Sequence, residues 1–231
     1  MLITFADRSS DSPVVDRVWR SHSERAGVFH SIAACNWDMV VTRLGGRTTL
    51  TVRGPETKAT MADCPGEGEW FGVRFKVGTF MPLMRCGDLR DRNDITLPNA
   101  TGRSFWLNGS AWDFPSFENA ETFVKRLVQR GLIMTDRTVE KALRGDLQNV
   151  TTRTEQRRVL RITGLTRGAI YQIERARRAT ILLQGGMPIL DVVYETGYYD
   201  QAHLTRSLQR FIGQTPARIA HGKEQLSLLY K

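Results

Sequence analysis

Residues 188–217 read PILDVVYETGYYDQAHLTRSLQRFIGQTPA, and the spacing of apolar residues in this stretch predicts two short helices joined by a turn. Gly197 supplies the left-handed backbone that the turn of a helix-turn-helix requires, and Asp200 is a suitable N-cap for the second helix. The stretch is therefore predicted to fold as a helix-turn-helix. The positions expected to face inward are Ile189, Val192 and Val193 in the first helix and Leu204, Leu208 and Phe211 in the second.

The outward face of the predicted second helix is polar and basic. Side chains of this kind near the start of such a helix read base edges in the major groove, because glutamine pairs with adenine and arginine with guanine. Threonine and arginine also bind phosphates, which position the helix without specifying a sequence. The residues on this face are Gln201, His203, Thr205, Arg206 and Arg210.

The stretch resembles the DNA-binding domain of the AraC/XylS family of bacterial transcription regulators, and the resemblance extends over about residues 136–220. Residues 151–164 (TTRTEQRRVLRITG) resemble the first recognition helix of that family, and residues 167–184 (RGAIYQIERARRATILLQ) resemble its linker helix. The resemblance implies a sequence-specific regulator with two helix-turn-helix units joined by the linker. It rests on Pro188-Ile189, Gly197-Tyr198, Gln201, Leu204, Arg206, Phe211, Gly213 and Thr215-Pro216, and in the linker on Arg175, Ala179, Leu182 and Leu183.

Two such units imply that DNA is read in two successive major grooves. At about 1.5 Å per residue the predicted linker spans roughly 25 Å, and successive major grooves on one face of a duplex lie about 34 Å apart. His203 has two open roles, reading a base or capping the helix start. The positions of the family assign base reading to Arg153, Gln156 and Arg157 in the first unit and to Gln201, Ala202, His203 and Arg206 in the second, and phosphate contacts to Arg161, Thr205 and Arg210.

The first unit departs from the family pattern at Glu155, where a carboxylate occupies the slot that Leu204 fills in the second unit. An unpaired buried carboxylate is costly, so we expect Glu155 to reach solvent or a basic neighbour such as Arg158. The preceding segment, residues 142–150, is also longer and more polar than the first turn of the family. We therefore expect the first unit to pack loosely or to read DNA weakly.

The net charge of +9 is concentrated in the second half of the chain. Residues 1–130 carry 17 Lys and Arg against 15 Asp and Glu, whereas residues 131–231 carry 16 against 9. A basic half beside a nearly neutral half is typical of a polyanion-binding part joined to a second module. For the linker arginines, a solvated face or a salt-bridge network is favoured over base reading: Arg175, Arg177 and Arg178.

The first part of the chain is predicted to be β-rich and to end in an amphipathic helix. That helix covers residues 117–128, with Ser116 as its N-cap and Gly131 at its end. The fold class is therefore α+β, with a β-rich domain at residues 1–115, a connecting helix at 116–135 and a DNA-binding domain at 136–231. The strand-like stretches are residues 28–34, 37–44, 47–53 and 69–77, with Gly45-Gly46 as a hairpin turn.

The resemblance implies that the first domain is a small cupin-like barrel that binds an effector, mediates dimerisation, or both. Trp37, Trp70 and Trp106 are candidate residues of a ligand pocket, with ordinary core packing as the alternative for them and for Trp112. Three hypotheses stay open. The chain is an effector-responsive regulator, or a regulator whose first domain only dimerises or binds a protein such as RNA polymerase, or a protein adaptor that has lost DNA affinity.

Several classes of function are not favoured by the sequence. Cys35, Cys64 and Cys86 are widely spaced and form no ligand motif with His22 or His30, so no metal site and no cofactor is expected. Phosphate loops, nucleophile elbows and zinc-protease helices are absent from the sequence, and we expect no enzyme. Without a long apolar run or a secretory signal, a cytoplasmic location is expected, with double-stranded promoter DNA as partner.

Overall fold

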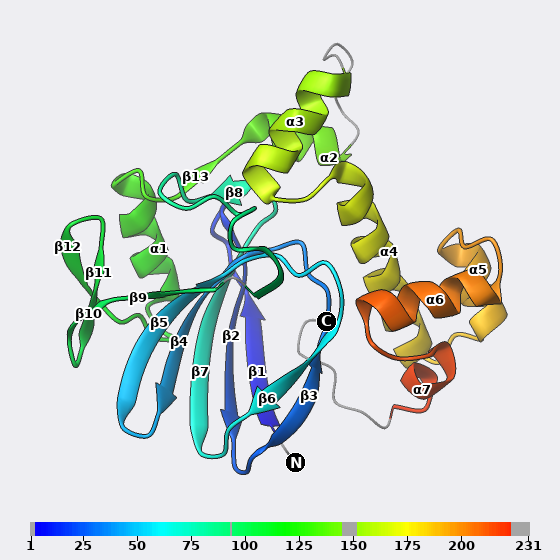
Figure 1. The fold of residues 1–231 in the computed structure, drawn as a ribbon, viewed down its shortest axis with the longest axis horizontal. Helices are drawn as coiled ribbons and strands as arrows, with labels where there is room; N and C mark the ends of the chain where they lie inside the picture. The colour runs from blue at the N-terminus through cyan, green and yellow to red at the C-terminus, as the bar shows by residue number, and fades with distance from the viewer. Residues whose placement is uncertain (1–2, 93, 145–151, 223–231) are drawn as a thin grey trace. The chain divides into compact units, whose positions relative to one another are not determined.

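The computed structural model describes residues 3–92, 94–144 and 152–222, and it consists of a strand-rich part followed by helices (Figure 1). This order confirms the predicted α+β class. Contacts divide the chain into two compact units, and they assign two short N-terminal segments to the unit of the last helices. The predicted division at residues 115 and 135 stays a prediction. Unit 1 comprises Met1–Gly27, Asn36–Pro55 and Cys64–Arg167, and unit 2 comprises Val28–Cys35, Glu56–Asp63 and Gly168–Lys231.

Unit 1 is built on a six-stranded antiparallel sheet in the order β1-β2-β7-β4-β5-β9. Its strands are β1 (Ile3–Ser9), β2 (Val15–Ser23), β7 (Gly68–Phe75), β4 (Asp38–Leu44), β5 (Arg47–Arg53) and β9 (Ile95–Leu97). The predicted hairpin turn is confirmed, because Leu44 pairs with Arg47 and both intervening glycines have positive φ. Within the described strands, β1 and β9 are the outer strands and do not pair with each other, so this sheet is open.

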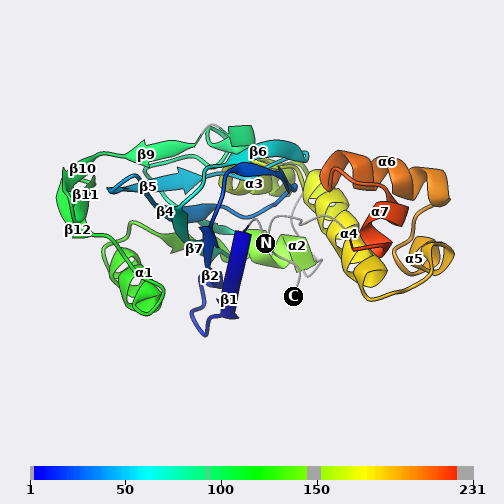
Figure 2. The same cartoon turned by 90° about the horizontal axis from the view of Figure 1, so that it is seen from below.

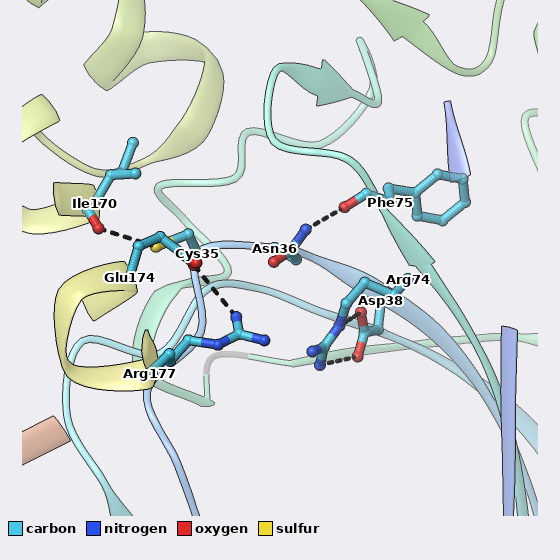
Figure 3. A network of polar contacts seen from close by, with 8 residues as sticks. All are labelled: Cys35, Asn36, Asp38, Arg74, Phe75, Ile170, Glu174 and Arg177. Atoms are coloured by element: carbon cyan, nitrogen blue, oxygen red, sulfur yellow. Dashed lines mark hydrogen bonds and ion pairs between the residues drawn. The ribbon is translucent and has the colours of Figure 1, made fainter. Parts of the chain in front are cut away.

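Strands β4 and β7 are joined by a buried ion pair as well as by backbone hydrogen bonds (Figure 3). Arg74 donates from Nε and Nη2 to the two carboxylate oxygens of Asp38, each at 2.9 Å. Asn36 Nδ2 donates to the Phe75 carbonyl at 2.7 Å in the same region. A bidentate geometry offsets part of the cost of burying two charges. Polar contacts therefore help to hold these two strands together.

Helix α1 (Ala120–Gln129) lies against one face of the sheet and closes the core of unit 1 (Figures 1 and 2). The helix starts at Ala120 rather than at residue 117, and Ser116 is not its N-cap. Instead, the Ser116 N–H donates to Asn119 Oδ1 at 2.9 Å. Gly131 follows the helix as expected, with φ +68°. The side chains that α1 buries are Ala120, Phe123, Val124 and Leu127.

Shorter elements complete unit 1. A three-stranded sheet consists of β10, β11 and β12, and β8 pairs with β13. The last two helices of the unit, α2 and α3, pack against each other. The bounds are β8 (Thr79–Phe80), η1 (Arg90–Arg92), β10 (Asn99–Thr101), β11 (Ser104–Leu107), β12 (Ser110–Asp113), β13 (Met134–Thr135), α2 (Arg137–Arg144) and α3 (Thr152–Thr163).

Unit 2 contains the remaining helices and a two-stranded sheet. The sheet pairs β3 (Gly27–Ser31) with β6 (Thr60–Cys64). Three buried positions of α4 (Ile173, Ala176 and Leu183) give this helix a continuous apolar face, because they follow helical spacing. The helices are α4 (Arg167–Gln184), α5 (Ile189–Glu195), α6 (Gln201–Phe211) and α7 (Pro216–Ala220).

Candidate nucleic-acid interface

The predicted helix-turn-helix of residues 188–217 is present as α5, a turn and α6. Gly197 in the turn has φ +69°, the left-handed conformation that the sequence requires there. The Asp200 carboxylate accepts a hydrogen bond of 2.6 Å from the backbone N–H of His203, which confirms Asp200 as the N-cap of α6. Both local predictions that define the motif are therefore confirmed.

The inward face of α6 is anchored by apolar side chains and by one polar contact. Leu204, Leu208 and Phe211 are buried, as their spacing predicts. Ser207 is buried beside them, and its hydroxyl lies 2.8 Å from the Tyr198 hydroxyl in a hydrogen bond. Ser207 occupies a helical position between two inward leucines, so its burial follows from spacing, but its partner does not. This contact ties α6 to the turn before it.

The outward face of α6 presents the predicted reading residues to solvent. Gln201, Ala202, Arg206 and Arg210 are exposed. Thr205 is half-buried, and its hydroxyl donates to the Gln201 carbonyl at 2.8 Å. The arrangement places amide and guanidinium groups on the surface of a helix whose opposite face is fixed in the unit.

The two roles left open for His203 are separated by the structure. The side chain that caps α6 belongs to Asp200, and His203 contributes only its backbone N–H to that cap. The imidazole is half-buried and contacts the Tyr198 ring edge to face, with 5.1 Å between centroids. His203 therefore lies at the margin of the outward face and is partly held by the turn.

Arg175 of α4 supports the turn between α5 and α6. Its guanidinium lies 4.1 Å from the Tyr198 ring centroid and donates to the Gly197 carbonyl at 3.3 Å and to Gln172 Oε1 at 2.7 Å. The neighbouring linker arginines form ion pairs, as predicted: Arg177 with Glu174 and Arg178 with Glu195. The sequence did not reveal the role of Arg175, because its partners lie in a different helix and in the turn.

Helix α3 exposes the residues predicted to read DNA in the first unit. Val159 and Ile162 are buried on the opposite side of the helix. The segment predicted to be unusually long, residues 142–150, lies partly outside the described residues, which resume at residue 152. The exposed residues on α3 are Arg153, Gln156, Arg157 and Arg161.

Asp136 connects α2 to α3. Its Oδ1 accepts hydrogen bonds from the Thr138 and Val139 N–H groups at 3.0 and 3.2 Å, and its Oδ2 accepts one from Arg158 Nε at 2.8 Å. Burial alone would raise the pKa of Asp136, but the Arg158 hydrogen bond and these backbone donors outweigh it and lower the pKa. The ionised Asp136 carboxylate therefore accepts hydrogen bonds from residues of both α2 and α3.

Glu155 is paired, but not with the neighbour that we expected. Its Oε1 lies 3.3 Å from Arg167 Nη1, whereas Arg158 is bound to Asp136. The Glu155 side chain is only 12% exposed, as expected for an inward slot, and that of Arg167 is 50% exposed. Glu155 has a basic partner as predicted, but the partner is Arg167 at the start of α4 and not Arg158.

The three tryptophans proposed as a ligand pocket lie in different environments. Trp37 is in the core, stacked on Phe75 with 4.0 Å between ring centroids, and its Nε1 donates to the Thr79 carbonyl at 2.7 Å. Trp106 is 47% exposed on β11. Trp70 alone of the three lines a hollow in unit 1.

This hollow has a volume of about 470 Å³ and lies between the ends of β1, β2, β4 and β7 and residues 115–118. Its lining combines apolar surface with charge: Phe71 and Phe117 with Arg20, His22, Arg43 and Glu69. The charged groups are partly paired, since Arg43 lies 3.5 Å from Glu69 and Arg20 lies 4.0 Å from Glu118. Polar and charged side chains are as frequent as apolar ones in this lining, so a ligand that fits the hollow needs both kinds of group.

Arg8 holds a segment, residues 115–118, that lines the hollow. It donates to both carboxylate oxygens of Glu121 at 2.5 and 2.8 Å and to the Phe117 carbonyl at 2.8 Å. The Phe117 ring has two guanidinium neighbours, with the Cζ atoms of Arg8 and Arg20 at 4.9 and 4.8 Å from its centroid. The hydrogen bonds from Arg8 lower the pKa of Glu121 to about 2. Residues 115–121 are therefore fixed to the sheet.

Comparison with known proteins identifies one part of the chain. Residues 146–221 match a family model described as a helix-turn-helix domain, and this range includes α3, α4, α5 and α6. Neither the curated proteins nor the solved structures give a significant match. None of the helices in the described residues is both long enough and apolar enough to span a bilayer.

Proposed function

We propose that the chain is a DNA-binding transcription regulator of the AraC/XylS type that reads promoter DNA with two helices, α3 and α6, in successive major grooves. The match of residues 146–221 to a helix-turn-helix domain supports this proposal. The observation that carries the proposal is the outward face of α6. Gln201 and Arg206 are exposed there, on a helix held from behind by buried leucines. Their side chains suit adenine and guanine edges, respectively.

The contribution of α3 to this proposal rests on exposure and charge. Arg153, Gln156 and Arg157 are exposed on one helix, and Arg161 adds a further cation at its end. The linker α4 has 18 residues, which at about 1.5 Å per residue span about 27 Å. That length suits two readers on one face of a duplex, where successive grooves lie about 34 Å apart.

Binding to duplex DNA tests the central proposal. Fluorescence anisotropy with a labelled random duplex, measured over a range of salt concentrations, is expected to show binding that weakens steeply as salt rises. Selection of bound sequences from a random library then defines the operator. Failure to bind any duplex at low salt would remove DNA reading and leave the protein-adaptor hypothesis.

We further propose that the chain responds to a small molecule bound in the hollow of unit 1. The support is its size and its lining of aromatic and charged groups, with Arg20 and Phe117 at its margin. A closed cupin-type barrel is not required, because this hollow lies on an open sheet. Heating the protein with pooled metabolites is the test, and a ligand is expected to raise the Tm by an amount that grows with the logarithm of its concentration relative to its Kd.

The alternative is a regulator whose first domain only dimerises or binds a protein. One observation reduces the support for dimerisation through α1. The apolar face of this helix, including Phe123 and Leu127, is already buried in the core of its own unit. If no metabolite pool changes the Tm while a variant that fills the hollow, Ala6→Trp, keeps full regulation, the effector proposal fails and the alternative stands.

A further inference from the structure

Two N-terminal segments, residues 28–35 and 56–63, belong to unit 2, and together we call them the arm. They are joined by the β3–β6 pairing and by an antiparallel bridge between Ala34 and Glu56, with backbone hydrogen bonds of 3.0 and 2.9 Å. The Ser31 hydroxyl adds a hydrogen bond of 2.9 Å to the Glu56 carboxylate. The arm is therefore a ribbon that its own contacts hold together.

Both segments of the arm bind the C-terminal end of α6. The Ala33 N–H donates to the Phe211 carbonyl at 2.8 Å, and the Ala59 N–H donates to the Arg210 carbonyl at 2.8 Å. The last carbonyls of a helix have no partner within the helix and need one from elsewhere. The arm therefore provides backbone caps for two carbonyls at the end of the helix that we propose reads DNA.

Gly213, just after α6, marks how closely the arm approaches. A Cβ atom at this position would lie 2.7 Å from His30 Nδ1 and 3.3 Å from the Ala59 Cβ. The residue also has φ +83°. Only a glycine leaves room for both segments of the arm against the end of the helix. The close contact between the arm and the end of α6 therefore depends on a glycine at position 213.

The arm also reaches α4. The Cys35 Sγ donates to the Ile170 carbonyl at 3.8 Å (Figure 3), and Ile32, Ala33 and Cys35 are buried. The start of α6 is capped by Asp200, and Ser207 in its second half is bound to Tyr198 of the preceding turn. The arm thus contacts both α4 and the C-terminal end of α6.

We propose that the arm is a positioning element of the second DNA reader, so that sequence-specific binding by α6 depends on the docking of Ala33 and Ala59 on its C-terminal end. Of the proposed reading residues, Gln201 is at the start of the same helix and Arg206 is in its middle. A shift of the capped end therefore changes the angle at which these side chains enter a groove. The inference rests on the proposed role of α6 in reading DNA.

The test compares two glycine-to-alanine variants that carry similar backbone strain. Gly213→Ala creates the collision with His30, whereas Gly186→Ala, at φ +85° in the same unit, meets no atom within 4 Å. Gly213→Ala is expected to lower affinity for the selected operator by about tenfold, the equivalent of one lost base contact. Gly186→Ala is the matched control, because it shows how much a positive φ at an alanine changes affinity without a collision. The double variant His30→Ala with Gly213→Ala is expected to recover most of the lost affinity.

The ratio of operator affinity to random-duplex affinity separates positioning from general damage. Positioning predicts that Gly213→Ala lowers this ratio, while a merely structural role lowers the Tm and leaves the ratio unchanged. If Gly213→Ala does not fold, Ala59→Pro removes the N–H that caps Arg210 and is expected to lower the ratio in the same way.

Three results would overturn the inference. They are equal ratios for Gly213→Ala and Gly186→Ala, no recovery in the double variant, or an unchanged ratio in Ala59→Pro. A wild-type chain that binds no duplex would refute the DNA-reading proposal itself, and the positioning role with it. Hydrogen exchange of the arm would still show in that case whether Gly213→Ala releases residues 28–35 and 56–63.

Discussion

Arg206 and Arg210 lie on the same helix and are both exposed, but they occupy different places relative to the helix start. We expect Arg206, in the middle of α6, to reach base edges and Arg210, near its end, to contact phosphate. Arg206→Ala is expected to cost about 1–3 kcal/mol on the selected operator and to relax specificity at one base pair. Selection from a library with the variant measures this directly.

Arg210→Ala is the matched comparison on the same helix. It is expected to weaken operator and random duplex about equally and to reduce the slope of log affinity against log salt by about 1. The two assignments are wrong if Arg206→Ala lowers affinity for every duplex by one common factor. They are also wrong if Arg210→Ala changes the selected sequence.

Glu121 gives unit 1 an acid-sensitive contact. Its pKa falls from 4.5 to about 2 because Arg8 donates two hydrogen bonds to the carboxylate. A folded-state pKa below the unfolded value means that the stabilisation is complete above about pH 4.5 and is lost as the pH falls towards 2. We therefore expect urea unfolding of the wild type to show stability that declines across this range.

Glu121→Gln is the control for that pH dependence. The amide cannot ionise, so the variant is expected to be less stable at pH 7 and to lose less stability between pH 4.5 and 2. The partial exposure of both side chains, 35% for Arg8 and 36% for Glu121, limits the size of the effect. Parallel stability curves for the two proteins over this range would contradict the assignment.

The outward residues of α6 were predictable from sequence, and the residues that support them were not. Helical spacing distinguishes Leu204 from Arg206 without any knowledge of the neighbouring elements. The contacts of Arg175 with the turn, and of Glu155 with Arg167, join residues of different helices. Spacing within one helix carries no information about such partners, which is why Arg158 was wrongly expected to pair with Glu155.

At the scale of elements, β4, β5 and β7 were predicted, whereas β1 and β2 were not. Strands β4 and β5 are flanked by a glycine pair that fixes their hairpin, and their bounds follow the prediction closely. Helix α1 was placed correctly but starts at Ala120, because Ser116 donates to Asn119 instead of capping the helix. The docking of the arm was not predictable, since residues near 30 and 59 meet residues near 211 only through tertiary packing.

Helix α3 carries the Glu155 carboxylate at an inward position, and its replacement by leucine measures how much this carboxylate lowers the stability of the protein. In Glu155→Leu the new side chain is buried, and Arg167 remains half exposed and hydrated. Removal of a largely buried carboxylate in favour of an apolar side chain is expected to stabilise the protein by about 1 kcal/mol or more. The shift of the urea midpoint at constant m-value measures the change.

Arg157→Leu is the control on the same helix, because that position is exposed and buries little of the added leucine. It is expected to change stability by less than about 0.5 kcal/mol. Destabilisation by Glu155→Leu would mean that the ion pair with Arg167 contributes more than the burial of a leucine. In that case Glu155 is a structural requirement of α3.

At the scale of the whole molecule, the distribution of charge fits the proposal that α3 and α6 both bind DNA. Residues 131–231 contain 16 basic and 9 acidic residues, and the exposed guanidinium groups of α3 and α6 belong to this half. Under that proposal, we expect phosphate attraction to act on both helices and base contacts to distinguish them. The contribution of α3 is then separable from that of α6 by substitution of its outward residues alone.

The double variant Arg153→Ala with Arg157→Ala is expected to shorten the recognised sequence to one half. The wild type is expected to select two blocks of bases about 10 base pairs apart, one for each reader. The variant keeps the block read by Gln201 and Arg206, loses the other, and shows a smaller salt slope because two cations are missing. Selection from a random library followed by footprinting gives both measurements. If the selected sequence keeps both blocks, α3 does not read DNA and the chain binds through α6 alone, which requires a second copy of the protein to account for any paired half-sites.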